Sequence, residues 1–568
     1  MHPAKGRQEP PNQQIAMKST AVLHFPDASL WCSLFLGASV AVSSWAEGSM
    51  FKPRHATPGG LRPEPFLYSV ERTEEGVTLH WQGLTPPYQV EAASGVVDPV
   101  WQVIAGPVAG ESLTLPADQS IEIFRVAASA PIYLGAKVCG ACHYEKHQEW
   151  QETRHAGALE TLKRIGMDKN QRCLQCHTVG LGLPTGFVSS EQTPQLGGVQ
   201  CENCHGPGGQ HIANLFDPSM RPKVTLAAET CGGCHTDAHH PTYDEWLDSG
   251  HAHMNEHVAD YFLTRGESMM SRCGACHSGA VRLAMLERVE ALADDPAAEI
   301  HYPTPEDAAY FTVECVVCHD AHADAGPHQL RNPTSSLENF SYQTSVDFAE
   351  QYNPDIQLCA QCHNMRGASW EDTSRPPHHS PQYNMLIGMA GYDPDGQLIQ
   401  RAHTFLEDQC AHCHTHAHEV PNPTEETPNY TGHTFRPTFE GCAECHGSAE
   451  IGELLAEGAR LAMDRRIAEV KALLDEWAAT RAPEELRAKY GALAWEYTNV
   501  GELSNPGGEA VSGPDSDEQT LIPDVIKQAR FNLYLVARDA SGGVHNGAYA
   551  RRLLQVAAEL VQGELNAP

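Results

Sequence analysis

Short runs that alternate between apolar and polar residues occupy the segment from residue 61 to residue 130. They read FLYSVE, GVTLHW, YQVEA, VWQVI, SLTL and IEIFRVA, with glycine and proline between them. A period of two is typical of strands with one buried face, and regularly spaced turn residues favour antiparallel pairing. The segment therefore predicts a small β-sandwich, immunoglobulin-like or fibronectin-like. Its role would be docking or spacing, or only that of a passive cap.

Helical periodicity dominates the segment from residue 449 to residue 568. The stretch IGELLAEGARLAMDRRIAEVKALLDEWAATR has apolar residues at helical spacing and is followed by Pro483, which predicts one long helix. An acidic linker rich in glycine and proline (505–519) leads to two more helical stretches, IPDVIKQARFNLYLVA and AYARRLLQVAAELV. We expect a helical hairpin or bundle.

Between residues 131 and 448 the chain has few long apolar stretches, and its loops are rich in Gly, Pro, Asn and Asp. This region instead repeats the pattern C-x-x-C-H nine times. We number these motifs 1 to 9 by their first cysteines, which are Cys139, Cys173, Cys201, Cys231, Cys273, Cys315, Cys359, Cys410 and Cys442. They use eighteen of the nineteen cysteines, so one recurring chemistry accounts for nearly every thiol.

The pattern C-x-x-C-H is the attachment signature of c-type haem. Its two thiols can add to the vinyl groups of one porphyrin, and the adjacent imidazole then faces the iron. The alternatives are zinc, iron–sulfur, a dithiol redox pair or a disulfide scaffold. A zinc ribbon needs paired C-x-x-C knuckles and has no reason to place histidine after each one. The sequence therefore predicts nine covalently attached c-type haems.

Haem would also supply the core that this region lacks, with short helices and loops wrapped around the porphyrins. The expected fold is mainly α with much irregular loop: a multihaem core of stacked haems at 131–448, an N-terminal β-sandwich at 61–130 and C-terminal helices at 449–568. The predicted covalent attachment sites are Cys139, Cys142, Cys173, Cys176, Cys201, Cys204, Cys231, Cys234, Cys273, Cys276, Cys315, Cys318, Cys359, Cys362, Cys410, Cys413, Cys442 and Cys445. The predicted proximal iron ligands are His143, His177, His205, His235, His277, His319, His363, His414 and His446.

Each haem iron has a second axial position, which the motif does not fill. Eighteen further histidines lie between residues 137 and 448, enough to supply an imidazole to every iron. For any one of them the alternative is a surface position or a hydrogen bond to a haem propionate. Met385 and Met389 lie near motif 7, but core packing is the favoured role for both. The candidate distal ligands are His155, His211, His251, His322, His378, His403, His416, His433 and His545.

An internal repeat supports this selection. Motifs 1 and 4 are both followed by W-x4-H-A, at Trp150 to His155 and at Trp246 to His251. A looser echo follows motif 7, where Trp370 precedes His378 and His379. The pattern indicates three modules of three haems, which begin near Cys139, Cys231 and Cys359.

The first 46 residues read as a secretory signal peptide, with Met17 and Lys18 ahead of the apolar run LWCSLFLGASVAV and small residues before Glu47. The polar segment before Met17 indicates an early start. An N-terminal membrane anchor is the alternative, although the apolar run is short for a span. Export to the periplasm or surface of a bacterium agrees with c-type haem, which is attached outside the cytoplasm.

The formal charge of −34 disfavours nucleic acid and anionic lipid as partners. Other redox proteins, extracellular acceptors or self-association into an assembly remain open, and an acidic surface also serves solubility. No later stretch has the apolar length of a membrane span.

The stretches YLGAKVCGACHYEKHQEWQETRHA, CLQCHTVGLGLPTGF and LGGVQCENCHGPGGQH resemble the tetrahaem "five-five-four" cytochrome c family of nitrifying bacteria. Further on, CVVCHDAHADAGPHQLR, CHNMRG and ARDASGGVHNGAYARRLL resemble larger octahaem and pentahaem nitrogen and sulfur oxidoreductases. The resemblance implies closely spaced haem pairs and a helical tail that folds back to supply His545. No motif here ends in the lysine of the pentahaem nitrite reductases, and no tyrosine could be matched to the crosslink of the hydroxylamine oxidoreductases.

Two functions follow from this reading. The first is an electron conduit, in which mostly bis-histidine haems exchange electrons between periplasmic or cell-surface partners. The second is an oxidoreductase that acts on a small nitrogen or sulfur compound, of the nitrite, hydroxylamine, tetrathionate or sulfite type, at one iron with an open distal position. His239, His240 or the cluster around His414 could then donate protons. A structural subunit of a surface complex is compatible with the first function.

The nine-motif reading predicts nine covalently bound haems per mature chain. Pyridine haemochrome quantitation against protein concentration measures this ratio, because thioether-linked haem stays with the denatured chain. Replacing both cysteines of one motif by serine should lower the ratio by one haem. Cys32 lies outside the motifs, in the predicted signal peptide, so Cys32→Ser should leave the ratio unchanged. A smaller wild-type ratio would contradict the count.

Overall fold

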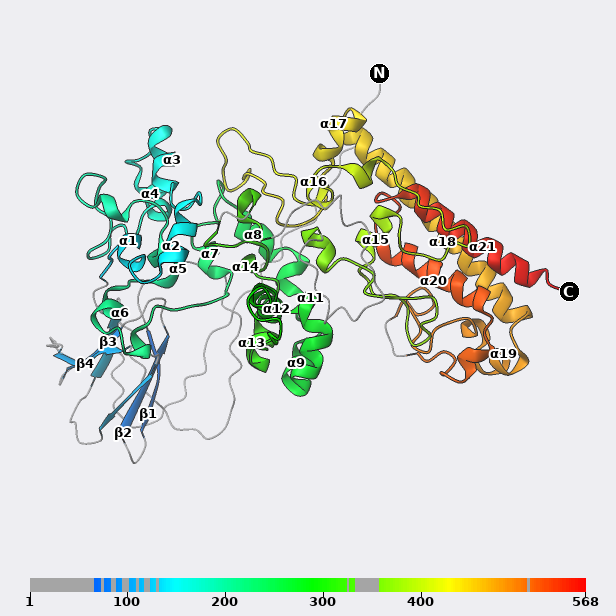
Figure 1. Ribbon diagram of the computed structural model, residues 1–568, viewed down its shortest axis with the longest axis horizontal. Coiled ribbons are helices and arrows are strands. Elements are labelled where there is room, and N and C mark those ends of the chain that lie inside the picture. The colour runs from blue at the N-terminus through cyan, green and yellow to red at the C-terminus, as the bar shows by residue number, and fades with distance from the viewer. Residues whose placement is uncertain are drawn as a thin grey trace, which may run out of the picture. The chain divides into compact units, whose positions relative to one another are not determined.

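The computed structural model describes residues 66–72, 76–82, 88–93, 102–108, 112–116, 123–128, 132–323, 326–331, 357–507 and 511–568 (Figure 1). The chain divides into two compact units, residues 1–129 and residues 130–568. The expected signal peptide lies outside the described residues. All nine motifs lie inside them.

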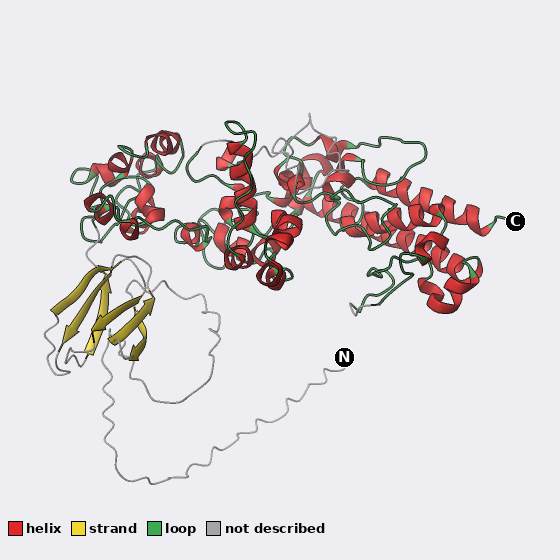
Figure 2. Cartoon of the chain, turned by 60° about the horizontal axis from the view of Figure 1, so that its bottom comes forward, coloured by secondary structure: helices red, strands yellow, loops and turns green. Residues whose placement is uncertain are grey.

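The first unit contains two antiparallel sheets of three strands each (Figure 2). The strand order is β1-β2-β5 in one sheet and β4-β3-β6 in the other. Each of the six predicted runs overlaps one strand. The strands are β1 (Phe66–Arg72), β2 (Gly76–Gln82), β3 (Tyr88–Ala93), β4 (Gln102–Val108), β5 (Ser112–Pro116) and β6 (Ile123–Ala128).

One hydrophobic core joins the two sheets. Leu79 and Trp81 of β2 lie in the same buried cluster as Tyr88 and Val90 of β3. The rings of Trp81 and Tyr88 meet edge to face, with their centres 5.7 Å apart. The two positions on each strand are two residues apart, which is the spacing that the alternating pattern predicts.

The second unit is helical, with long connecting loops (Figure 2). In its first part, most helices are only one or two turns long. These helices are α1 (Ala136–Cys139), α2 (Tyr144–Gln151), α3 (Ala158–Arg164), α4 (Gln171–His177), α5 (Cys201–His205), α6 (Gly209–Ala213), α7 (Glu229–Gly232), α8 (Thr242–Leu247), α9 (Ala259–Arg265), α10 (Glu267–Met269), α11 (Ala275–His277), α12 (Gly279–Ala291), α13 (Pro305–Tyr310), α14 (Cys315–Cys318), α15 (Gln382–Ile387), α16 (Cys410–His414) and α17 (Ala443–His446).

The C-terminal part carries the long helices α18 (Ala449–Thr480), α20 (Asp524–Asp539) and α21 (Gly547–Leu565), together with the short α19 (Glu484–Tyr490). Ser448 caps the start of α18 by accepting a hydrogen bond from the backbone N–H of Ile451. The three long helices pack together (Figure 1) and share the largest apolar cluster among the described residues. The predicted helical bundle is therefore present, and each of the three predicted helices begins within two residues of its expected start.

A buried polar network lies inside this bundle. The fully buried Arg530 of α20 donates to the carbonyl oxygens of Trp495 and Glu496, at 2.9 and 2.8 Å. The Tyr534 hydroxyl donates to Oε1 of Glu496 at 2.7 Å. Because Arg530 and Glu496 have hydrogen-bond partners, their burial does not simply destabilise the core. Their hydrogen bonds instead fix α20 relative to the segment that follows α19.

Apolar packing is sparse in the region of the motifs. The described residues there form only small apolar clusters. In one of them, Phe262 and Met270 pack with Val281 of α12. This agrees with the expectation that side chains alone do not build the core of the region. No helix among the described residues is both long and apolar enough to cross a membrane.

The bundle predicts a large effect of Trp477, which is 1% exposed and lies in α18. Trp477→Ala should lower the free energy of unfolding by about 3–5 kcal/mol, because it leaves a cavity among α18, α20 and α21. The matched control is Leu454→Ala on the same helix, where the side chain is 72% exposed, and it should change stability by at most about 0.5 kcal/mol. Denaturant melts followed by helical circular dichroism compare the two, and equal midpoints would contradict the packing.

Candidate haem sites

The motif turns present two thiols and one imidazole on the same side of the chain. In α5, for example, Cys201, Cys204 and His205 occupy positions i, i+3 and i+4 of one helical turn. Residues at this spacing lie next to one another on a helix surface. The other motifs also lie on or beside single helical turns, so each can hold one porphyrin edge and face its iron. None of the eighteen described cysteines forms a disulfide.

Seven of the nine motif histidines lie opposite a histidine from a distant part of the chain. The distances between ring centres fall within 6.1–6.3 Å. The pairs are His235 with His155, His205 with His322, His363 with His251, His277 with His378, His319 with His433, His446 with His403, and His414 with His545.

This spacing fits two imidazoles that share one metal ion. A metal–nitrogen bond of about 2 Å on each side, plus roughly 1.1 Å from each nitrogen to its ring centre, puts the centres about 6 Å apart. Rings in direct contact would lie closer, as His251 and Phe435 do with centres 4.3 Å apart. The seven pairs therefore have the donor chemistry and the spacing that an axially ligated haem iron requires.

Burial keeps several of these imidazoles neutral, which ligation requires. Burial lowers the pKa of His235, of His251 and of His433 to about 4 in each case, and neighbouring histidines add to the shift. The second ring nitrogen is often held by the backbone: Nδ1 of His205 bonds the carbonyl of Lys223 and Nδ1 of His414 bonds that of Phe435, both at 2.8 Å. Donation from Nδ1 leaves Nε2 as the free ligand atom.

The loop that carries His433 is held by a residue that the sequence did not single out. Glu245 of α8 accepts hydrogen bonds from the backbone N–H groups of Thr431 and His433, at 2.8 and 2.7 Å, and from the Thr431 hydroxyl. Glu245 immediately precedes Trp246 of the repeated W-x4-H-A pattern. One carboxylate thereby orients a histidine almost two hundred positions away, and no local pattern indicates this contact.

Two distal candidates are not placed opposite a motif histidine. The ring of His416 lies near Gly441, and the buried Nδ1 of His211 has no hydrogen-bond partner. Among the described residues, His143 of motif 1 and His177 of motif 2 lack a ring at the spacing of the seven pairs. Burial lowers the pKa of His240, and His177 adds to this shift, which places these two histidines near each other.

The repeat between the first two modules extends to individual hydrogen bonds. The indole N–H of Trp150 donates to the carbonyl of Val199, two residues before motif 3, and Trp246 donates to Val313, two residues before motif 6, both at 3.0 Å. Correspondingly, His155 faces motif 4 and His251 faces motif 7. The histidine of each W-x4-H-A pattern thus pairs with the first motif of the next module. The third copy differs, because His378 faces motif 5.

Contacts between thiols show which motifs are neighbours. Five pairs of thiols lie close enough to shift each other's pKa: Cys139 with Cys201, Cys176 with Cys234, Cys231 with Cys315, Cys276 with Cys362, and Cys359 with Cys410. At longer range, one thiol affects the pKa of another between Cys204 and Cys231, Cys318 and Cys359, and Cys413 and Cys442. Together these contacts connect all nine motifs.

Comparison with known proteins identifies the class of this arrangement. The family model described as cytochrome c554 and c-prime matches residues 138–206, which contain motifs 1 to 3. Cytochrome c-554 of Nitrosomonas europaea is 33% identical over 164 residues, which cover 23% of this chain and 67% of that protein.

Two further likenesses extend over more of the chain. The multiheme cytochrome MtrA of Shewanella baltica is 24% identical over 302 residues, which cover 44% of this chain and 78% of MtrA. The crystal structure of the outer cell wall cytochrome OcwA covers 76% of this chain and 100% of its own, at a TM-score of 0.49 and 19% identity. The identity and coverage of cytochrome c-554, together with the repeated haem-attachment turns, show that the chain belongs to the cytochrome c-554 family of multihaem c-type cytochromes.

Proposed function

We propose that the chain binds nine c-type haems and carries electrons by hopping between them, without bond chemistry. The eighteen motif cysteines would hold the porphyrins, and the nine motif histidines would be the proximal ligands. The seven histidines paired with them would be distal ligands, so that most irons are bis-histidine. When bound, each haem supplies a reversible one-electron Fe(III)/Fe(II) couple.

The observation that carries this proposal is the continuity of the thiol contacts. They connect the motifs in the order 1, 3, 4, 6, 7, 8 and 9, with motif 2 beside motif 4 and motif 5 beside motif 7. Because the thiols bond to the porphyrin edge, neighbouring thiols bring the edges of two haems close together. The order gives a trunk from motif 1 to motif 9 and two side branches.

Exposure at the ends of the trunk fits exchange with partners. Cys142 of motif 1, Cys204 of motif 3 and Cys445 of motif 9 are exposed, whereas the other motif cysteines are partly buried. Beside motif 9, the start of α18 exposes Ile451, Leu454 and Leu455. Electrons would enter and leave near motifs 1 and 3 on one side and near motif 9 on the other, and the haems between motifs 3 and 9 would be more shielded from side reactions.

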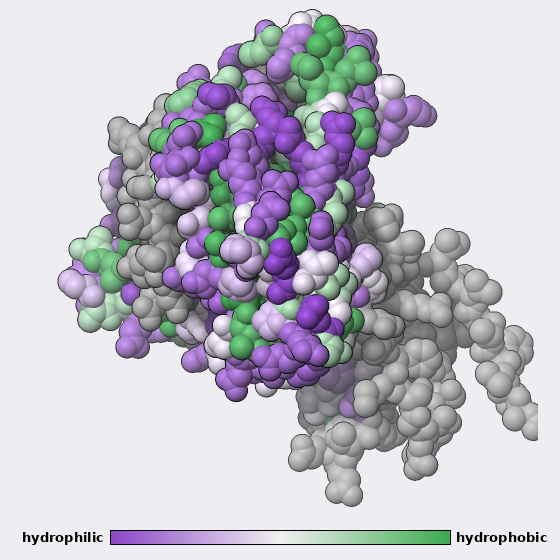
Figure 3. All heavy atoms as spheres, turned by 90° about the vertical axis from the view of Figure 1, so that its right-hand side faces the viewer, coloured by the Kyte–Doolittle hydropathy of each residue, from purple (hydrophilic) through white to green (hydrophobic). Residues whose placement is uncertain are grey.

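The partners are other redox proteins, extracellular acceptors or further copies of the chain. Mature protein would act in the periplasm or at the cell surface after loss of residues 1–46. The face in Figure 3 is largely hydrophilic, and the formal charge is −34. Basic partners or mineral surfaces would be attracted over long range, with a rate that falls as salt rises.

A second candidate function is an oxidoreductase that acts on a small nitrogen or sulfur compound. It is favoured by His143 and His177, which among the described residues have no imidazole at the spacing of the seven pairs. One of these irons could accept a ligand in its distal position, with His239 or His240 near motif 2 as a proton donor. The two functions differ in the spin state of those irons.

The relay order makes motif 6 the single connection between motifs 1–4 and motifs 5 and 7–9. Replacing Cys315 and Cys318 by serine removes the haem of motif 6. Electrons from a donor that docks at motif 1 should then reduce the haem of motif 9 more slowly. Replacing Cys273 and Cys276 removes motif 5, a side branch, and is the matched control: it deletes one haem from the same region but should leave transfer along the trunk intact. Stopped-flow absorbance measures both, and equal slowing would contradict the order.

The histidine pairs predict the spin state of individual irons. His155→Ala should convert one iron per chain, that of motif 4, from low spin to high spin, because the distal imidazole is lost. His253→Ala is the matched control, since His253 is exposed and bonds only Glu256 and the carbonyl of Leu247. Electron paramagnetic resonance of the oxidised protein distinguishes the two variants, and an unchanged spectrum of His155→Ala would contradict the pairing.

The same spectrum of the wild-type protein separates the two functions. Nine low-spin irons would favour the conduit alone. A high-spin signal that changes on addition of nitrite, hydroxylamine or sulfite would instead favour the oxidoreductase.

A further inference from the structure

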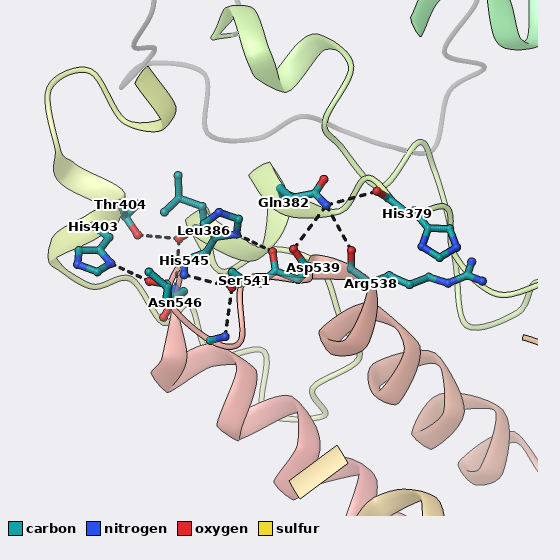
Figure 4. A network of polar contacts seen from close by, with 12 residues as sticks. His379, Gln382, Leu386, His403, Thr404, Arg538, Asp539, Ser541, His545 and Asn546 are labelled. Atoms are coloured by element: carbon teal, nitrogen blue, oxygen red, sulfur yellow. Dashed lines mark hydrogen bonds and ion pairs between the residues drawn. The ribbon is translucent and has the colours of Figure 1, made fainter. Parts of the chain in front are cut away.

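The turn between α20 and α21 carries one proposed iron ligand, His545, and forms a hydrogen bond with another, His403 (Figure 4). The ring of His545 lies opposite His414 of motif 8. The carbonyl oxygen of Val544, one residue earlier, accepts a hydrogen bond from Nδ1 of His403 at 2.7 Å. His403 in turn faces His446 of motif 9. The turn therefore sets the surroundings of the last two haems of the relay.

A carboxylate is built into this turn. Oδ1 of Asp539 lies 2.7 Å from Nδ1 of His545 (Figure 4), and the Asp539 side chain is only 3% exposed. Its second oxygen accepts a hydrogen bond from the Ser541 hydroxyl. The Ser541 oxygen accepts the backbone N–H groups of Gly543 and His545, at 3.2 and 3.3 Å. The ring of His545 is thus held in place from both its backbone and its Nδ1.

This contact also determines the tautomer. A carboxylate accepts hydrogen bonds but donates none when ionised, so Nδ1 of His545 carries the proton and Nε2 is free toward His414. A hydrogen bond from Nδ1–H to a buried carboxylate makes the ligating nitrogen more basic than a hydrogen bond to a neutral carbonyl does.

Other proposed ligands have a neutral partner at Nδ1. It is a backbone carbonyl for His205, His277, His319, His403 and His414, and the Ser380 hydroxyl for His378.

The nearest parallel is His322, opposite motif 3. Its Nδ1 lies 3.7 Å from Oδ1 of Asp320, beyond hydrogen-bond distance. Asp320 also forms an ion pair with Arg331, with 3.1 Å between the charged atoms, which offsets its charge.

We propose that Asp539 is a positioning residue that lowers the reduction potential of the haem at motif 8. This inference rests on the proposed function, in which His545 is the distal ligand of that haem. A more basic imidazole and a nearby buried negative charge both stabilise Fe(III) relative to Fe(II), and hydrogen bonding to ligands is a known lever of haem potential. Motif 8 lies between motifs 7 and 9, so electrons in the trunk would pass an uphill step just before the exposed end.

The test is a potentiometric titration of Asp539→Asn in the full-length haem-loaded protein, followed by haem absorbance. The low-potential component, one ninth of the signal, should shift to higher potential, while the rest of the curve and the low-spin resonance spectrum stay unchanged. Asparagine keeps the size of the side chain and removes its charge. Asp320→Asn is the matched control and should shift the titration less, because Arg331 already offsets that carboxylate.

Two outcomes would overturn the proposal. One is an unchanged titration with low-spin iron retained. The other is a high-spin signal in Asp539→Asn, which would mean that the carboxylate only holds the ring in place. His545→Ala separates a failure of the ligand assignment: it should create one high-spin iron, and a fully low-spin spectrum would show instead that His545 is not a ligand.

Discussion

The pairing of two imidazoles across one metal-sized gap is the constraint on which most of this structure depends. Each motif turn is local and needs only five consecutive residues. In seven of the nine motifs a partner histidine comes from far along the chain, as His322 does for His205 and His545 does for His414. In a region with few apolar clusters, such long-range links replace the contacts of an ordinary core. Coordination of this kind couples ligand binding to folding, because the donors converge only in the folded chain.

Where the chain does build an apolar core, that core positions one of the paired histidines. The bundle of α18, α20 and α21 ends α20 at Asp539 and begins α21 at Gly547, so the intervening turn is held between two buried helices. Asn546, which lies beside Leu386 in Figure 4, strengthens this hold. Its side chain donates to the carbonyl oxygens of Leu386 and Ile399, at 3.2 and 2.7 Å. The hydrophobic bundle therefore positions His545 to a precision that a free loop would not provide.

The local features of the fold were predictable from the sequence. The six strands follow from alternation, the long helices from apolar spacing and Pro483, and the motif turns from C-x-x-C-H. Seven of the nine distal candidates lie opposite a motif histidine, and the most instructive are His155 and His251, because the repeated tryptophan marks them. The bonds from Trp150 and Trp246 to the chain before motifs 3 and 6 give the repeat a physical meaning.

The features that the sequence did not predict depend on contacts that no local pattern encodes. Which motif a distal histidine faces depends on tertiary packing, so His378 follows motif 7 in sequence but faces motif 5. The carboxylates that orient His433 and His545, Glu245 and Asp539, look in sequence like ordinary acidic residues of an acidic chain. Only their burial and their partners distinguish them from the solvated majority.

The direction of the pairing also has a consequence for how the relay is assembled. His155 of the predicted first module faces motif 4, and His251 of the predicted second module faces motif 7, so neither motif histidine is paired within its own module. Pairs also run in the opposite direction, because His322 faces motif 3, His378 faces motif 5 and His433 faces motif 6. In the last module, the turn after α20 places His545 opposite motif 8 and provides the carbonyl that holds His403 opposite motif 9. Neighbouring modules thus supply the histidines opposite motifs 3 to 7, whereas the helical bundle supplies the corresponding contacts for motifs 8 and 9.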